Sequence, residues 1–153
     1  MKKIAVFPGS FDPITKGHES IIRRALPLFD GIIIALGNNT NKNNFFSLEK
    51  RLKWIEQLFA SEPRLTVQQY SGLTIDFCKK VNAQYILRGL RTSEDFEFER
   101  TIASMNKAMY PEIETVFILS NPELSAINST IVRDILRHGG DASQFIPKGI
   151  KLI

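Results

Sequence analysis

The feature that most constrains the fold of this sequence is an uninterrupted apolar run, Ile32-Ile33-Ile34-Ala35-Leu36. A strand with one face in solvent alternates apolar and polar residues, whereas a strand buried on both faces is apolar throughout. Strands of the second kind belong to parallel sheets that helices cover on both sides. The run therefore predicts an α/β protein built around a buried parallel sheet.

Further apolar stretches predict strands at residues 4–7, 65–69, 85–87 and 116–119. Apolar residues at helical spacing predict helices at residues 21–29, 48–59, 74–82, 94–110 and 128–138. This alternation predicts a single doubly wound (Rossmann-like) α/β domain over residues 1–153, with a five-stranded parallel sheet and helices on both faces. In such sheets ligands bind beyond the carboxyl ends of the strands.

Charge and cysteine content narrow the class of protein. The net charge is +4, but the basic residues are dispersed, so a site for several phosphates explains it as well as nucleic-acid binding does. No apolar run approaches the roughly 20 residues of a membrane span, and the first run is too short for a signal peptide. The single cysteine, Cys78, excludes an intrachain disulfide and is expected to be a buried thiol. We therefore expect a cytoplasmic protein without a membrane or nucleic-acid partner.

The first strand runs into a loop with the sequence GSFDPITKGH, from Gly9 to His18. Gly9 allows close approach of a ligand to the backbone, and Ser10 offers a hydroxyl. Gly17 and His18 then open a helix, whose free N–H groups suit an anion. Two interpretations stay open on the loop alone, a phosphate cradle and a tight turn with a capping histidine.

Polar residues also follow the other strands. Lys42 lies in an asparagine-rich loop at 38–44, which is either a phosphate contact or a solvated surface loop. Arg88 and Arg91 follow the fourth strand and could grip phosphate, pair with the acidic residues at 94–99, or do both. Residues 128–130, Asn-Ser-Thr, open the last helix and could cap it or form a second anion site.

Groups for general acid–base catalysis are scarce in this sequence. It has two histidines, and His138 is explained by its place at a helix end. Cations, hydroxyls and backbone donors suit phosphoryl or nucleotidyl transfer, in which the protein mainly positions groups and stabilises charge.

Several strings of residues resemble a known family. Residues 15–18, Thr-Lys-Gly-His, resemble the (T/H)xGH motif of the nucleotidyltransferase superfamily, and residues 127–133 resemble its ISSTxxR motif. The strings PGSFDPITKGH, RGLRTSEDFEFE and MNKAMYPEIETVF, in that order, closely resemble the bacterial phosphopantetheine adenylyltransferase family. The resemblance runs from residue 3 to about residue 145.

The resemblance implies a reaction. Members of the family join ATP and 4′-phosphopantetheine into dephospho-coenzyme A and pyrophosphate, the penultimate step of coenzyme A synthesis. The acceptor phosphate would attack the ATP α-phosphate in line, with no covalent intermediate, and Mg²⁺ would be held mainly by the ATP phosphates. The resemblance also implies a homohexamer and feedback inhibition by coenzyme A.

The resemblance assigns roles to individual residues. His18, Lys42, Ser10 and Arg91 would be catalytic. The residues implied to bind ATP are Gly9, Ser10, Phe11, Gly17, His18, Gly89, Leu90, Arg91, Glu99, Leu124, Ser125, Ala126, Ile127, Asn128, Ser129 and Thr130. Those implied to bind phosphopantetheine are Ser10, Lys42, Leu73, Thr74, Arg88 and Asn106. Asn128 stands where the motif usually has serine.

Three other functions are alternatives to this interpretation. Another small nucleotidyltransferase would use nicotinamide mononucleotide or glycerol 3-phosphate, but the RGLR string and Lys42 argue against it. A nucleic-acid-binding module would need a basic face with interleaved aromatic residues, which the sequence lacks. A regulator that binds nucleotides without catalysis is disfavoured by the presence of His18, Lys42, Arg88 and Arg91.

Overall fold

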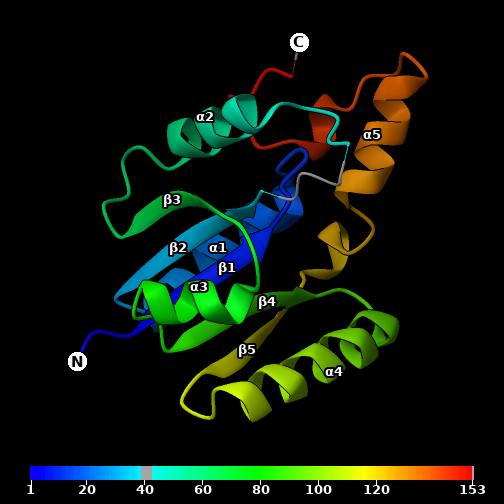
Figure 1. Ribbon diagram of the computed structural model, residues 1–153. Helices are drawn as coiled ribbons and strands as arrows, with labels where there is room; N and C mark the ends of the chain where they lie inside the picture. The colour runs from blue at the N-terminus through cyan, green and yellow to red at the C-terminus, as the bar shows by residue number, and fades with distance from the viewer. Residues whose placement is uncertain (39–42, 153) are drawn as a thin grey trace.

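The computed structural model describes residues 1–38 and 43–152. Its central feature is a five-stranded sheet with the strand order β3-β2-β1-β4-β5, in which every pair of neighbours is parallel (Figure 1). The strands are β1 (Ile4–Gly9), β2 (Gly31–Gly37), β3 (Leu65–Tyr70), β4 (Tyr85–Leu90) and β5 (Glu114–Leu119). The predicted parallel sheet is confirmed.

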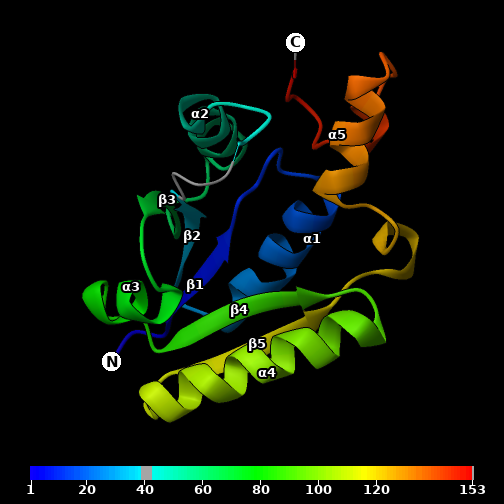
Figure 2. The same ribbon diagram turned by 45° about the vertical axis from the view of Figure 1, so that its right-hand side comes forward.

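Helices cover the sheet on both faces. They are α1 (Lys16–Ala25), α2 (Leu48–Leu58), α3 (Thr74–Lys80), α4 (Ser93–Met109) and α5 (Ser129–Arg137), with 3₁₀ turns at Leu26–Leu28, Pro122–Leu124 and Ser143–Phe145. Helices α1 and α2 lie on one side of the sheet, and α3 and α4 lie on the other (Figure 2). The helices predicted at residues 48–59, 74–82, 94–110 and 128–138 agree with α2 to α5 to within two residues. The stripe predicted at residues 21–29 covers only the second half of α1, which begins at Lys16 and ends at Ala25, before Pro27.

The sheet separates two apolar cores, because successive strand residues point to opposite faces. In β2, Ile32, Ile34 and Leu36 pack against α1 and α2. Ala35 joins the core formed with α3, against which Ile33 is also packed. This arrangement explains the uninterrupted apolar run, since a polar residue on either face of β2 would be buried.

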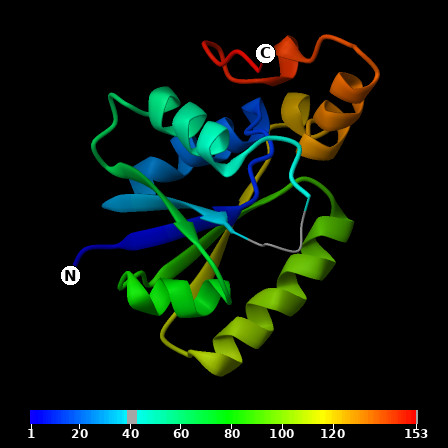
Figure 3. The ribbon, with the colours of Figure 1, turned by 45° about the horizontal axis from the view of Figure 1, so that its top comes forward.

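The order of the strands defines where a ligand can bind. From β1 the chain moves outward through β2 to β3, and it then returns to the other side of β1 with β4. The direction of winding changes between β1 and β4, and the crevice beyond the carboxyl ends of strands at such a point is the usual ligand site. Helix α5 lies beyond these strand ends, at the opposite end of the molecule from the N-terminus (Figure 3).

One strand boundary differs from the sequence prediction in a way that affects the site. Strand β4 extends to Leu90, so Arg88 and Gly89 lie within the strand, paired with Phe117 and Ile118 of β5, rather than in a loop after it. Because Arg88 is polar, the apolar pattern ends at Leu87 and does not reveal the last three residues of the strand. A Cβ atom at Gly89 would lie 3.1 Å from Cγ1 of Ile21, which explains the glycine by close packing against α1.

Two smaller predictions can also be compared with the structure. Cys78 is fully buried in α3, as expected, and burial raises the pKa of its thiol to about 12. The helix predicted over residues 94–110 is also present, as α4, but Phe98 and Met105, which its apolar spacing places on one face, are exposed rather than packed on the core. No helix in the described part of the chain has the length and apolar character needed to cross a membrane.

Candidate active site

Two pockets lie side by side at the carboxyl ends of β1 and β4. The larger has a volume of about 780 Å³ and the smaller about 360 Å³. Five residues line both pockets and form what we call the shared wall: Pro8, Gly9, Ser10, Arg88 and Glu99. Two ligands bound in these pockets would therefore meet at Ser10 and Arg88.

The smaller pocket is bounded by the loop after β1 and the start of α1. The hydroxyl oxygen of Thr15 accepts a hydrogen bond from the backbone N–H of His18, and the backbone N–H of Thr15 donates to Nδ1 of His18 at 3.0 Å. This reciprocal capping box satisfies two donors at the helix start. The prediction that His18 caps the helix is thus confirmed, but the cap involves only Nδ1, one of the two ring nitrogens.

The contacts of His18 fix its tautomer. Because Nδ1 accepts a hydrogen bond from an N–H group, the ring proton resides on Nε2. Burial, followed by the positive charges of Arg88 and Arg91, lowers the pKa of His18 to about 4. At neutral pH the imidazole is therefore a neutral donor through Nε2–H, and the edge-on ring of Phe11, with centroids 4.9 Å apart, holds its orientation.

This tautomer can be tested by ¹⁵N NMR. We expect the ring of His18 to keep a proton on Nε2 and a bare Nδ1 from pH 8 to pH 5, because its pKa lies near 4. A His138→Gln variant leaves one histidine and assigns the signals. Titration near the ordinary value of about 6.5, or a proton on Nδ1, would contradict this assignment.

Arg88 and Glu99 form a two-pronged ion pair at the shared wall. The Nε and Nη2 atoms of Arg88 donate to the two carboxylate oxygens of Glu99 at 2.9 and 2.7 Å, and Nη1 donates to the carbonyl of Pro8 at 2.7 Å. These bonds leave one N–H on each terminal nitrogen. The two interpretations of Arg88, a phosphate contact and an ion pair with a nearby acidic residue, are compatible. Glu99 orients the guanidinium, and two N–H groups are left for a ligand phosphate.

Arg91 is held in a similar but more exposed way. Its Nε and backbone N–H both donate to Oδ2 of Asp95, at 3.2 and 3.1 Å. Asp95 also forms the capping box of α4 with Thr92. The acidic residues that follow the fourth strand therefore position both arginines at the smaller pocket.

The first residues of α5 close the other side of the smaller pocket. Oδ1 of Asn128 accepts from the backbone N–H of Ile131, so Asn128 acts as the cap that the sequence suggested. The hydroxyl of Ser129 donates to the carbonyl of Pro13 at 2.8 Å, which ties α5 to the loop after β1. Oγ1 of Thr130 accepts from Arg133 at 3.2 Å. Asn128, Ser129 and Thr130 thus each have a structural contact and also line the pocket.

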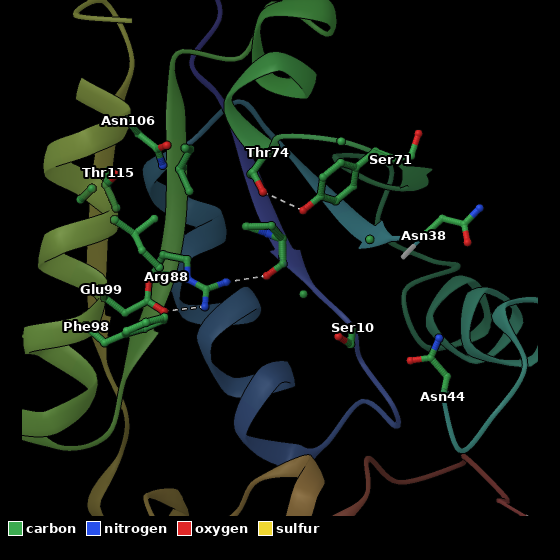
Figure 4. A pocket seen from close by; sticks show the side chains of 18 residues that line it. Ser10, Asn38, Asn44, Ser71, Thr74, Arg88, Phe98, Glu99, Asn106 and Thr115 are labelled. Atoms are coloured by element: carbon green, nitrogen blue, oxygen red, sulfur yellow. Dashed lines mark hydrogen bonds and ion pairs between the residues drawn. The ribbon is translucent and has the colours of Figure 1, made fainter. Parts of the chain in front are cut away.

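The larger pocket is bounded by α4 on one side and by the ends of β2 and β3 on the other. Figure 4 shows Phe98, Glu99 and Asn106 on α4, with Asn38 and Asn44 across the pocket. The hydroxyls of Tyr70 and Thr74 lie 2.8 Å apart in a hydrogen bond. The lining combines apolar side chains with amide groups, which suits a ligand that carries both methylene and amide groups.

Comparison with known proteins identifies the family. A sequence model of the Cytidylyltransferase-like family matches residues 6–135. The phosphopantetheine adenylyltransferase of Flavobacterium johnsoniae is 53% identical over 148 residues, which cover 97% of each protein. That of Cytophaga hutchinsonii is 48% identical over 147 residues, which cover 96% of this chain and 98% of the relative. The chain belongs to the phosphopantetheine adenylyltransferase family.

A solved structure supports the fold of this family member. A bifunctional NMN adenylyltransferase/ADP ribose pyrophosphatase from Francisella tularensis superposes with a TM-score of 0.72 at 22% identity. The match covers 95% of this chain and 45% of that longer chain. At this identity the likeness concerns the fold alone, and it agrees with the predicted Rossmann-like architecture.

The structure brings most of the residues assigned from the family resemblance to the two pockets. The smaller pocket is lined by Gly9, Ser10, Phe11, Gly17, His18, Gly89, Arg91, Glu99, Ile127, Asn128, Ser129 and Thr130. The larger pocket is lined by Ser10, Thr74, Arg88 and Asn106. Their roles toward a ligand stay predictions.

A few assigned residues lie elsewhere. Leu90 is buried at the end of β4, residues 124–126 form the turn before α5, and Leu73 is the exposed cap residue next to Thr74. None of these lines either pocket. Lys42 lies outside the described residues, so its assignment also stays a prediction.

Sequence reasoning missed some residues of the site. Arg133 lines the smaller pocket, and its Nη1 donates to the carbonyl of Asp12 at 2.8 Å. Its place as the last residue of the ISSTxxR-like string was the available signal. Tyr70 lines the larger pocket, but its position at the end of a strand gave no hint of its contact with Thr74.

The carboxylates that line the pockets have partners in the protein, arginines for Glu99 and Asp95 and the backbone N–H groups of Phe45 and Phe46 for Asp12. Glu99 is paired with Arg88, and Asp95 with Arg91. Within residues 1–38 and 43–152, no cluster of three or more His, Cys, Asp or Glu side chains could hold a metal ion.

Gly17 provides a test that separates folding from ligand binding in this family member. A Cβ atom there would lie 3.4 Å from Oγ1 of Thr15 and 3.7 Å from the carbonyl of Ile127, which are ordinary contacts. We expect Gly17→Ala to unfold at the same or a higher temperature, because alanine favours helix. We expect ATP affinity, measured by calorimetry, to fall about tenfold, because the methyl group occupies space in the pocket. Unchanged ATP affinity would contradict a phosphate cradle at this helix start.

Proposed function

We propose that this chain transfers the adenylyl group of ATP to the phosphate of 4′-phosphopantetheine and releases pyrophosphate and dephospho-coenzyme A. The observation that carries the proposal is the identity of about half of all positions with relatives of that name over nearly the whole chain. The two pockets that meet at the shared wall supply a matching geometry, since the reaction must bring two anionic ligands together.

The chemistry explains why the described residues of the site include no paired general acid and base. The nucleophile is a phosphate monoester with a second pKa near 6, so it is largely ionised at neutral pH and needs no enzyme base. The task of the protein is to hold the acceptor phosphate in line with the α-phosphate of ATP and to stabilise the charge that develops there. Cations and neutral donors serve this task.

We assign ATP to the smaller pocket and the acceptor to the larger one. The free N–H groups at the start of α1 and Nε2–H of His18 would contact ATP phosphates. Ser10 and Arg88, at the shared wall, would contact the acceptor phosphate as it approaches the α-phosphate. The Thr74 and Asn106 side chains would line the pantetheine arm.

We propose that Mg²⁺ enters with ATP and is held by the phosphate oxygens, because the carboxylates that line the pockets are engaged, Glu99 and Asp95 by arginines and Asp12 by backbone N–H groups. The ion would neutralise part of the triphosphate charge. A homohexamer and inhibition by coenzyme A belong to the same proposal and rest on the family resemblance. A cytoplasmic location, expected from the single cysteine, belongs to it as well.

The proposal is tested by the acceptor dependence of pyrophosphate release with ATP and Mg²⁺. We expect release with 4′-phosphopantetheine and none with nicotinamide mononucleotide or glycerol 3-phosphate. Mass spectrometry of the product identifies dephospho-coenzyme A. Release with another acceptor alone would replace the proposed acceptor, and ATP binding without any release would favour a regulator.

A further inference from the structure

Two charged side chains near the site are buried without an assigned role. Arg51 of α2 is 2% exposed and Asp12 of the β1–α1 loop is 4% exposed. A charge taken out of water must be compensated by hydrogen bonds or an opposite charge, so such residues require an explanation. Lys53, on the same helix, is exposed to solvent.

The contacts of Arg51 and Asp12 join two loops. Nε of Arg51 donates to the carbonyl of Phe46 at 3.0 Å, and Nη1 donates to the carbonyl of Ser10 at 2.7 Å. The carboxylate of Asp12 accepts from the backbone N–H groups of Phe45 and Phe46 at 2.7 and 2.9 Å. The loop after β1 and the segment before α2 are thus tied together from both sides.

Arg51 is one member of a wider pattern along the end of β1 and the loop after it. Three alternate carbonyls of this segment each accept a hydrogen bond from Nη1 of an arginine on a different element. The pairs are Pro8 with Arg88 of β4, Ser10 with Arg51 of α2, and Asp12 with Arg133 of α5, at 2.7, 2.7 and 2.8 Å. The three hydrogen bonds fix the orientation of these carbonyls and hence of the backbone between them.

The backbone between these anchors is strained. Phe11 has a φ angle of 48°, in the left-handed region that L-residues other than asparagine and aspartate seldom adopt. Such a conformation persists only where the surroundings enforce it. Here the carbonyls on both sides of Phe11 are held by Arg51 and Arg133, and the Phe11 ring packs edge-on against Phe7 and His18.

We propose that Arg51 is a positioning residue for adenylyl transfer, which holds Ser10 and the strained Phe11 backbone in place for the acceptor phosphate. The effect of Arg51 on turnover rests on the proposed function. Arg51 lines neither pocket, so it acts through Ser10 and not by touching a substrate. Arg88 and Arg133 differ from it because both also line the smaller pocket.

The kinetic test compares Arg51→Lys with Lys53→Gln, a matched change on the exposed face of the same helix. Lysine keeps the charge but presents a single point donor, so it cannot hold both carbonyls with the geometry of a fork. We expect Arg51→Lys to lower kcat at least tenfold while the Kd for ATP changes less than threefold. Lys53→Gln should leave kcat and Kd unchanged.

A loss of structure alone would give a different result. If Arg51 only stabilised the fold, the folded fraction of Arg51→Lys would keep normal kcat, and activity would follow thermal unfolding. That result would overturn the proposal, as would a kcat equal to that of Lys53→Gln.

A second measurement uses the wild-type protein and needs no turnover. We expect the Nε–H of Arg51 to exchange slowly with solvent, because it is buried and donates to the carbonyl of Phe46, and we expect the exchange at residues 9–12 to become faster in Arg51→Lys. Fast exchange of the Arg51 Nε–H in the wild type would overturn the proposal. If wild-type protein fails to adenylate 4′-phosphopantetheine, the proposed function fails on its own, while this measurement still decides whether Arg51 holds the loop.

Discussion

Replacing His18 with alanine is expected to lower turnover by about two to three orders of magnitude, the usual cost of removing one donor to transition-state charge. The donor is Nε2–H, because Nδ1 is occupied by the backbone N–H of Thr15. The imidazole is neutral at pH 7, since its pKa lies near 4. Its contribution is therefore a directed hydrogen bond and not a positive charge. Steady-state kinetics of pyrophosphate release measure the effect.

Controls separate this loss from an effect on folding. The alanine variant also loses one half of the capping box of α1, which costs about 1 kcal/mol of the free energy of unfolding. His138→Ala changes the other histidine, which is exposed at the end of α5, and should keep normal turnover. A folded His18→Ala protein with near-normal turnover would exclude His18 from the transition state.

The second large effect is expected at Arg88. Arg88→Met should lower kcat/KM for both substrates at least about a hundredfold, because charge-assisted hydrogen bonds to the phosphates are lost at the shared wall. It should also lower the free energy of unfolding by about 2 kcal/mol, because the largely buried carboxylate of Glu99 loses its partner. Kinetics and chemical denaturation measure the two effects.

A double variant distinguishes the two consequences of losing Arg88. Arg88→Met alone leaves the negative charge of Glu99 without a partner, and adding Glu99→Gln removes that charge. We expect most of the lost stability to return while kcat/KM stays low. Recovery of kcat/KM along with stability would mean that Arg88 serves only to neutralise Glu99.

The sheet could be predicted from the sequence because the physical constraint on β2 is local. Burial on both faces demands apolar residues at each position from Ile32 to Leu36, and no tertiary information is needed to recognise that pattern. Strand β4 is different. Arg88 lies in the strand, but its side chain contacts Glu99 of α4 and the carbonyl of Pro8 of β1. The local pattern does not show these contacts with other elements, so the strand appears to end before the polar residue.

The shared wall could be assigned in part, and Arg51 could not. The turn-forming residues around Gly9 and the cations after β4 are unusual enough at strand ends to indicate an anion site. Arg51 lies between charged and apolar residues on an ordinary amphipathic helix, where an arginine usually faces solvent. Its burial depends on the carbonyl of Phe46, just before the helix, and on the carbonyl of Ser10, 41 residues away in the sequence, which local patterns do not report.

The exposed face of α4 shows the same limit. The spacing of Phe98, Ile102 and Met105 correctly places these residues on one face of the helix. Spacing reports which residues share a face but not what that face contacts. In the structure Phe98 and Ile102 border the larger pocket, so part of this apolar face belongs to the candidate site rather than to the core.

The central claim is that the two pockets bring the acceptor phosphate directly in line with the α-phosphate of ATP, with no enzyme nucleophile between them. The stereochemistry at the α-phosphorus tests it most directly, with ATP made chiral at that position by a sulfur substituent and 4′-phosphopantetheine as the acceptor. A single direct displacement predicts inversion of configuration in the dephospho-coenzyme A product. Retention would require two successive displacements, and therefore a covalent adenylyl-enzyme, and would contradict the account.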